Sequence, residues 1–213
     1  MTGQVGFENE VSAPGGLRDR KKLKTRLAIE DAALELFSEK GFEATTVDDI
    51  AERAEVSTTT FFRYFPNKAD VILTEQIERL PSLRQSIIDQ PGSDSEIEAL
   101  RNAIQQEWVG HIDPVRTART TKAISSSRLL RGLGHEIGHT WQIAVSEALA
   151  RRRGLRKVDA RAWLAATMAL SVFGDSVKSW ADSGCRGDLG KAVDRGFDTL
   201  QSLCDDWASS PDR

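Results

Sequence analysis

The amino-acid sequence predicts an all-α protein in which an N-terminal helix-turn-helix domain of three helices precedes a larger helical domain. Apolar residues recur at spacings of three and four along most of the 213 residues, and no segment shows the sustained alternation expected of a β-strand. Two short apolar stripes, in residues 47–54 and 58–65, are separated by only three residues, Glu55-Val56-Ser57. Two short helices joined by so short a turn are typical of a helix-turn-helix.

Length and composition exclude several classes of protein. A chain of 213 residues can bury a sizeable core, and its two cysteines, Cys185 and Cys204, lack the clustered spacing of a zinc site. The first 17 residues lack the basic start and apolar run of a signal peptide, and no run of about 18 apolar residues occurs. We therefore expect a cytoplasmic protein with no membrane partner. The net charge of -3 means that any basic surface is local, and residues 18–26, RDRKKLKTR, form one.

The N-terminal domain is expected to follow a disordered tail. Residues 1–17 are rich in Gly and polar residues. A first helix begins near Arg18 and ends at Gly41. Its apolar face is formed by Ile29, Ala32, Ala33, Leu36 and Phe37. The domain spans residues 18–67, and residues 68–213 form the second domain.

Hydroxyl residues mark the starts of the second and third helices. Thr46 can cap the second helix, with Asp49 three residues later as the acidic partner of a capping box. Ser57 can cap the third helix, which ends at the Pro66-Asn67 turn.

The third helix carries side chains that suit a DNA groove. Its first turn holds small hydroxyl residues, which can approach phosphates and base edges closely, and Arg63 could reach a guanine. Phe61 and Phe65, four residues apart, would face the core. Phe62 and Tyr64 then lie on other faces, where lining a DNA backbone is one reason for their exposure. The alternative is an ordinary three-helix subdomain whose threonines are merely solvated.

The segment TRLAIEDAALELFSEKGFEATTVDDIAERAEVSTTTFFRYFPNKADVI, residues 25–72, resembles the N-terminal DNA-binding domain of the TetR family of transcriptional regulators. The resemblance runs without a gap through the Gly41-Phe42 break and the Phe62-x-Tyr64-Phe65 run. It implies that residues 57–64 form a recognition helix in the major groove. The expected DNA contacts are Thr58, Thr59 and Arg63 to bases, Thr46, Ser57, Phe62, Tyr64 and Lys68 to the backbone, and Thr60 beside them.

Glu55 departs from the pattern of this family, which usually has Gly at that position of the turn. If the backbone there is left-handed, a residue with a Cβ is strained by about 1–2 kcal/mol, and the carboxylate would also repel DNA. Phe62 stands where Tyr is common and lacks the phosphate-binding hydroxyl.

The second domain is expected to be helical throughout, with a turn at Gly132. The expected helices are 68–90 with a break near Pro81, 94–110, 113–131, 133–153, 158–184 and 189–208. The segment ARRRGLRKVDARAWLAATMALSVFGDSVKSWADSG, residues 150–184, resembles regulators of the mycofactocin type. By that resemblance, the last two helices form a four-helix interface in a homodimer, and the helices before them enclose an effector pocket.

The apolar pattern of the last two helices agrees with a dimer. The helix at 158–184 is apolar over much of its circumference, so it should be buried on more than one side. The last helix has an apolar stripe that continues to its end. Its members are Leu189, Val193, Phe197, Leu200, Leu203, Cys204 and Trp207. A monomer could cover both helices, but a two-fold partner would also match a two-fold operator.

Tryptophans are the expected pocket residues. Trp108 and Trp141 come from helices that should flank a cavity, although a single Trp is more often a core residue. Met168 and Phe173 are further candidates. Similar regulators commonly sense acyl-CoA esters or other large apolar effectors. The Arg151-Arg152-Arg153 cluster could meet phosphates, or it could complement the dipole of a helix end.

The segment HEIGH, residues 135–139, matches the H-E-x-x-H pattern of zinc hydrolases. His135 and His139 would be ligands and Glu136 the general base, but such a site needs a third ligand. Glu147, the last Glu of the chain, follows His139 by only eight residues, and the remaining histidine lies far upstream. A chance match is therefore the favoured interpretation, and we expect no metal site and no cofactor.

These observations together predict a regulator and not an enzyme. The expected protein is a homodimeric TetR-like repressor that binds double-stranded, palindromic operator DNA. A small apolar effector, acyl-CoA-like by resemblance, would release it. The alternative is a zinc-dependent hydrolase that uses the HEIGH segment.

Overall fold

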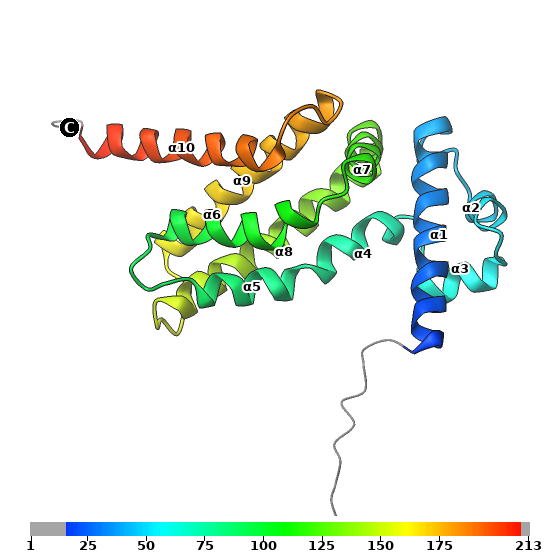
Figure 1. Ribbon diagram of the computed structural model, residues 1–213, viewed down its shortest axis with the longest axis horizontal. Coiled ribbons are helices and arrows are strands. Elements are labelled where there is room, and N and C mark those ends of the chain that lie inside the picture. The colour runs from blue at the N-terminus through cyan, green and yellow to red at the C-terminus, as the bar shows by residue number, and fades with distance from the viewer. Residues whose placement is uncertain (1–15, 210–213) are drawn as a thin grey trace, which may run out of the picture.

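The computed structural model describes residues 16–209, and every regular element in that range is a helix (Figure 1). These elements are α1 (Leu17–Lys40), α2 (Val47–Arg53), α3 (Thr58–Tyr64), α4 (Asp70–Glu78), α5 (Leu80–Asp89), α6 (Glu96–Glu107), the 3-10 helix η1 (Val109–His111), α7 (Pro114–Ser126), α8 (Arg128–Arg152), α9 (Ala160–Asp182) and α10 (Leu189–Ala208). The all-α prediction is confirmed. The tail expected at residues 1–17 lies outside the described residues except for its last two, and α1 begins at Leu17. No helix among the described residues is long and apolar enough to cross a membrane.

Helices α1 to α3 form the N-terminal domain, at the right of Figure 1. Phe37 of α1 packs on Phe42, with ring centroids 5.1 Å apart. Phe61 of α3 packs on Phe65 at 5.9 Å, and both are buried, as the sequence predicts. Since Ile50 of α2 is buried in the same cluster, the two short helices are held on one face of α1.

The predicted caps set the starts of α2 and α3. Thr46 Oγ1 accepts a hydrogen bond from the backbone N–H of Asp49 at 3.1 Å, and Asp49 Oδ2 accepts one from the backbone N–H of Thr46 at 2.7 Å. This is the expected capping box. At α3, Ser57 Oγ accepts from the backbone N–H of Thr60 at 3.1 Å.

The C-terminal domain is a helical bundle in which α9 and α10 pack against each other and against α6. Its buried core includes Leu83, Ile87, Leu100, Ile104, Leu149, Ala166 and Phe197. Gly196 of α10 lies so close to α9 that a Cβ there would stand 2.7 Å from Cγ1 of Val172. The last turns of α10 extend beyond the bundle (Figure 1), and Leu203 and Trp207 are 62% and 85% exposed.

Helices α7 and α8 pack against the N-terminal domain. Ala123 of α7 and Leu130 and Ile137 of α8 are buried in the core of that domain. Ser127, between the two helices, donates from its Oγ to Glu43 Oε1 at 2.6 Å. The cores of the two domains are therefore joined through this pair of helices.

Two predicted breaks in the C-terminal domain had different outcomes. The break near Pro81 is confirmed, because α4 ends at Glu78 and Pro81 lies in the first turn of α5. The turn expected at Gly132 is wrong, since Gly132 lies inside α8. The break between α7 and α8 lies instead at Ser127. The Ser127 hydroxyl caps α8 by accepting from the backbone N–H of Leu130 at 3.2 Å.

We expect Gly196→Ala to lower the free energy of unfolding by about 1–3 kcal/mol, because the new methyl group would collide with Val172 and separate α9 from α10. Gly138→Ala in α8 is the matched control. A Cβ there meets nothing within 4 Å, so the higher helix propensity of Ala should stabilise the chain by about 1 kcal/mol. Urea unfolding of both variants measures the two changes. A stabilising effect of Gly196→Ala would contradict the close contact.

Candidate nucleic-acid interface and ligand cavity

The turn between α2 and α3 has a left-handed residue at Glu55, with φ of 54°. Glu55 is exposed, and its backbone N–H donates to Glu52 O at 3.0 Å. The left-handed position inferred from the sequence is therefore present, and the Cβ of Glu55 makes it strained.

Helix α3 presents polar residues on the side opposite its buried phenylalanines. Ser57, Thr59, Phe62 and Arg63 are exposed, Phe62 at 55%, whereas Phe61 has no exposed surface. Residues four apart lie on one face of a helix, so Thr59 and Arg63 share a face. The remaining residues predicted on this helix, Thr58, Thr60 and Tyr64, are half-buried. Helix α3 thus offers hydroxyls, one guanidinium and one exposed ring to a partner.

Several of the predicted contact residues are already engaged within the domain. The guanidinium of Arg63 lies 5.4 Å from the ring centroid of Tyr64. Ser57 Oγ and Thr60 Oγ1 are hydrogen-bonded at 2.9 Å. Thr46 Oγ1 donates to Asp49 Oδ2 at 2.7 Å, and Lys40 Nζ lies 2.7 Å from the same oxygen. The hydrogen bond from Lys40 holds the pKa of Asp49 well below its usual range.

The ammonium of Lys68 binds the backbone of the protein itself, whereas the sequence predicts that it binds a DNA phosphate. Its Nζ donates to three backbone carbonyls of the loop after α1. The acceptors are Phe42 O at 2.7 Å, Glu43 O at 3.3 Å and Thr45 O at 2.7 Å. The same ammonium lies 4.3 Å from the ring centroid of Phe42, and its burial lowers the pKa of Lys68. Since an ammonium has three donors, Lys68 is committed to this loop.

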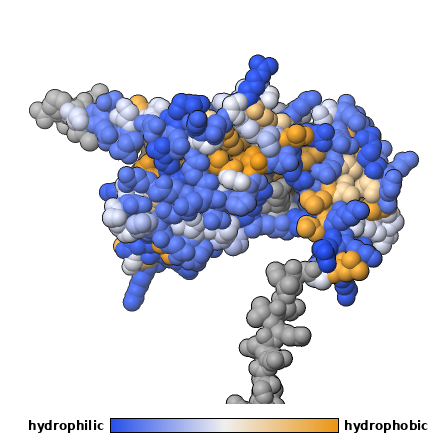
Figure 2. Space-filling model, in the orientation of Figure 1, coloured by the Kyte–Doolittle hydropathy of each residue, from blue (hydrophilic) through white to orange (hydrophobic). Residues whose placement is uncertain are grey.

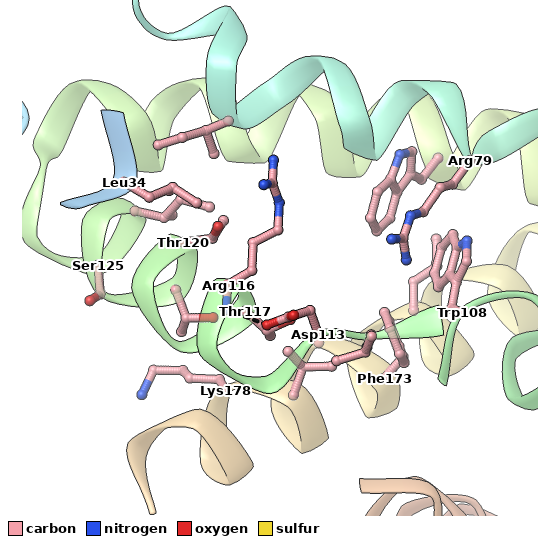
Figure 3. A pocket seen from close by; sticks show the side chains of 18 of the residues that line it. Leu34, Arg79, Trp108, Asp113, Arg116, Thr117, Thr120, Ser125, Phe173 and Lys178 are labelled. Carbon is pink, nitrogen blue, oxygen red and sulfur yellow. Dashed lines mark hydrogen bonds between the residues drawn. The ribbon is translucent and has the colours of Figure 1, made fainter. Parts of the chain in front are cut away.

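A cavity of about 480 Å³ lies between α4, α7, α8 and α9, and Leu34 of α1 also reaches it (Figure 3). One wall is aromatic. The ring centroid of Trp108 lies 4.5 Å from that of Trp141 and 4.8 Å from that of Phe173. Both indole Nε1 atoms are buried without a hydrogen-bond acceptor. The structure thus places three of the four predicted pocket residues on the cavity, whereas Met168 does not line it.

The cavity wall also has a polar part, which was missed by the sequence analysis, beside aliphatic residues such as Leu34, Ile72 and Leu170. It carries cationic and hydroxyl side chains that no apolar pattern could reveal. These residues are Arg79, Arg116, Thr117, Thr120, Thr121, Ser125, Arg131 and Lys178, together with Asp113. Arg79 Nη2 donates to His111 O at 3.3 Å, and Asp113 caps α7 by accepting from the backbone N–H of Arg116 at 2.8 Å.

The arginines at the end of α8 bind the protein itself. Arg152 donates to the backbone carbonyls of Gln90, Pro91 and Asp94 in the loop between α5 and α6. Arg153 binds Asp159, the cap of α9. Two of the three arginines proposed for phosphate therefore hold loops of the C-terminal domain.

The HEIGH segment lies on α8 with His135, Glu136 and His139 exposed. His139 touches the edge of the Trp163 ring, with centroids 6.0 Å apart. Among residues 16–209, no group of three or more His, Cys, Asp or Glu side chains is placed to hold a metal ion. No third ligand therefore accompanies the two histidines within the described chain.

Comparison with known proteins shows what the N-terminal domain is similar to. Residues 29–74 match the model of the bacterial regulatory proteins of the tetR family. The transcriptional regulator TcmR of Streptomyces glaucescens is 52% identical over 59 residues, which cover 28% of this chain and 26% of TcmR. Two curated relatives are about half identical to this chain over the N-terminal domain. The chain spans less than a third of the length of either relative.

Two similarities extend into the C-terminal domain. The mycofactocin biosynthesis transcriptional regulator MftR of Mycobacterium tuberculosis is 28% identical over 166 residues, 72% of this chain and 80% of MftR. The crystal structure of the regulator FadR of Bacillus subtilis, solved in complex with stearoyl-CoA, has a TM-score of 0.57 at 22% identity and covers 82% of this chain and 96% of FadR. The second similarity shows that the fold is shared.

We expect Glu55→Gly to raise the free energy of unfolding by about 1 kcal/mol, because Gly has no Cβ to strain at φ of 54°. Glu55→Ala is the matched control, since it removes the same charge but keeps a Cβ in the left-handed position. Denaturant unfolding of both variants separates the two causes. Equal stabilisation by Ala and Gly would mean that charge, and not backbone conformation, makes Glu55 costly.

Proposed function

We propose that this chain, whose N-terminal domain is that of the tetR family, is a homodimeric regulator of transcription that leaves its operator DNA when a small molecule fills the cavity. The observation that carries the proposal is the exposed face of α3, which presents Thr59, Phe62 and Arg63. Helix α3 is capped by Ser57 and directly follows the turn of the helix-turn-helix. A helix of this kind enters the major groove with its first turns at the base edges.

The proposed DNA contacts are divided by chemistry. Arg63, Thr58 and Thr59 are assigned to bases, because a guanidinium can bind guanine O6 and N7 together and small hydroxyls can approach base edges. The backbone contacts are Thr46, Ser57, Thr60, Phe62 and Tyr64. Lys68 is assigned an indirect role, since it holds the loop that leads into α2.

The first turns of α1 form a local basic surface, although the net charge of the whole chain is -3. All of the side chains in this part of the helix are exposed. The cations are Arg18, Arg20, Lys21, Lys22 and Lys24. Exposed cations next to a recognition helix favour phosphate binding and make the affinity depend on salt.

Helices α9 and α10 are assigned to the dimer. Leu164 of α9 is 57% exposed, and the apolar stripe of α10 continues into its projecting end with Leu203 and Trp207. Figure 2 shows a largely hydrophilic surface with only local apolar patches, so large apolar side chains exposed together need a partner. A second copy would cover them and would set two recognition helices on a two-fold operator.

The effector is assigned to the cavity beside α7. Its aromatic wall and its volume of about 480 Å³ suit a small apolar molecule. Part of a larger ester such as an acyl-CoA is the candidate favoured by the resemblance to FadR, whose own complex holds stearoyl-CoA. Binding would change the spacing of the two recognition helices, so the effector and the operator would exclude each other. The HEIGH segment carries no proposal, because no third ligand accompanies its two histidines among residues 16–209.

Fluorescence anisotropy on duplexes tiled across the DNA flanking the gene tests the proposal. We expect tight binding to one near-palindromic duplex, stronger than to a scrambled duplex and weaker at higher salt. Equal weak binding to every duplex would remove specific DNA recognition from the proposal.

We expect Arg63→Ala to cost about 1–3 kcal/mol of operator binding and to relax discrimination at the base that Arg63 reads. Lys22→Ala is the contrasting variant. It should weaken binding equally on all operator variants and reduce the salt slope by about 1. If Arg63→Ala has the uniform effect instead, Arg63 binds phosphate.

We expect the double variant Leu203→Glu, Trp207→Glu to be monomeric, because two carboxylates would be buried in the α10 interface. Light scattering after size exclusion measures the mass. Leu129→Glu, at another exposed apolar residue, is the control and should remain dimeric. A dimeric double variant would place the interface elsewhere.

A further inference from the structure

Arg116 of α7 is shared by two parts of the molecule. It lines the ligand cavity and also a cleft between α1 and α7. In the cleft, its Nη2 donates to Glu30 Oε2, and its Nη1 lies 3.4 Å from Asp31 Oδ1. Figure 3 shows the Arg116 side chain extending from α7 into the cavity, between Leu34 and Trp108.

Glu30 connects Arg116 to the helix-turn-helix. The residue is only 3% exposed, and its Oε1 accepts from Arg26 Nε at 2.9 Å. Arg26 also donates to both carboxylate oxygens of Glu78 in α4, at 2.9 and 2.6 Å. The guanidinium carbon of Arg26 lies 5.8 Å from the ring centroid of Phe65, the residue that ends α3. A continuous set of contacts thus runs from the cavity to α4 and to the end of α3.

The cavity has chemistry for an acid with an aromatic body. Trp108, Trp141 and Phe173 form an aromatic wall. The charged residues of the lining have a cationic excess, with four cations against one carboxylate. These charged residues are Arg79, Arg116, Arg131 and Lys178 against Asp113. A volume of about 480 Å³ lies within the range of roughly 300–1,000 Å³ that holds drug-sized ligands.

We infer that the cavity takes an aromatic carboxylic acid whose carboxylate binds Arg116 in competition with Glu30, so that the ligand loosens the contact between α1 and α7. The inference rests on the proposed function. It replaces the apolar, acyl-CoA-like effector considered there with an aromatic acid, and it names the residue through which that effector acts.

The competition follows from the burial of Glu30. A ligand carboxylate on Arg116 lies close to Glu30, and like charges in a site of low dielectric repel each other strongly. Glu30 is only 3% exposed, so water replaces little of a lost ion pair while α1 stays packed on α7. When Arg116 binds the ligand, Glu30 keeps Arg26 as a partner, and the guanidinium of Arg26 also binds Glu78. The bound acid therefore weakens the docking of α1 on α7, whereas a neutral ligand of the same shape leaves the ion pair intact.

Matched acids and amides test the charge of the ligand. The probes are naphthalene-acetic and biphenyl-acetic acids and the corresponding amides, which have nearly the same shape without the charge. Quenching of tryptophan fluorescence reports occupancy, since Trp108 and Trp141 line the cavity. Hydrogen exchange of the α1 backbone reports the contact with α7. We expect each acid that binds to do so about 10-fold more tightly than its amide and to speed exchange in α1.

Three variants locate the effect. Arg116→Gln should remove the preference for the acid. Arg119→Gln is the matched control, because Arg119 also faces α1, 3.5 Å from Glu35 Oε1, but does not line the cavity. It should keep the preference. In Glu30→Gln the buried charge is gone, so the acid should bind at least as tightly as to the unmodified chain but no longer speed exchange in α1.

The inference is overturned if no acid binds, if acid and amide bind equally, or if Arg116→Gln keeps the preference. These readouts use the chain without DNA. A failure to bind any duplex would therefore count against the proposed function alone, while the fluorescence and exchange results would still decide the role of Arg116.

Discussion

One buried carboxylate, that of Glu30, binds cations from both sides of the contact between the two domains. A carboxylate with so little exposure needs cations, and it takes them from two helices, Arg26 of α1 and Arg116 of α7. Loss of one partner from a buried pair costs about 3–5 kcal/mol, because the remaining charge stays out of water. The neighbouring pair of Arg119 with Glu35 is more exposed and is worth far less. The ion pairs of Glu30 therefore act together with the apolar packing of Ala123 and Leu130 to hold α1, and with it α2 and α3, on α7.

The parts of this structure that the sequence predicts are those determined by nearby residues. The caps at Thr46 and Ser57 use donors only three residues away, so a short motif contains both partners. The left-handed residue at Glu55 was indicated by the family resemblance, because that family usually has Gly at this position of the turn. Amphipathic spacing likewise predicts most helices, because packing repeats with the period of the helix. The tryptophan wall of the cavity was also within reach, since large aromatic residues are few.

The missed features depend on distant partners or on helical phase. Ser127 ends α7 and also binds Glu43, which is 84 residues away, so no local pattern favours it over Gly132 as the break. Lys68 resembles a free surface cation until the carbonyls that it binds are known. Met168 precedes Leu170 by two residues, about 200° around the helix, so it points away from the wall that Leu170 and Phe173 form. Composition could indicate that α9 lines the cavity, but it could not indicate which face of α9 does so.

The clamp formed by Lys68 has a mechanical consequence. Lys68 stands two residues before α4 and holds the loop after α1, while Asn67 Oδ1 accepts from the backbone N–H groups of Ala69 and Asp70. The start of α4 is thus fastened to the helix-turn-helix at several points. The other end of α4 is also tied to α1, because Glu78 accepts from the guanidinium of Arg26 at 2.9 and 2.6 Å. Helix α4 is therefore bound to the N-terminal domain at both of its ends, so any displacement of α4 would carry α1, α2 and α3 with it as one body.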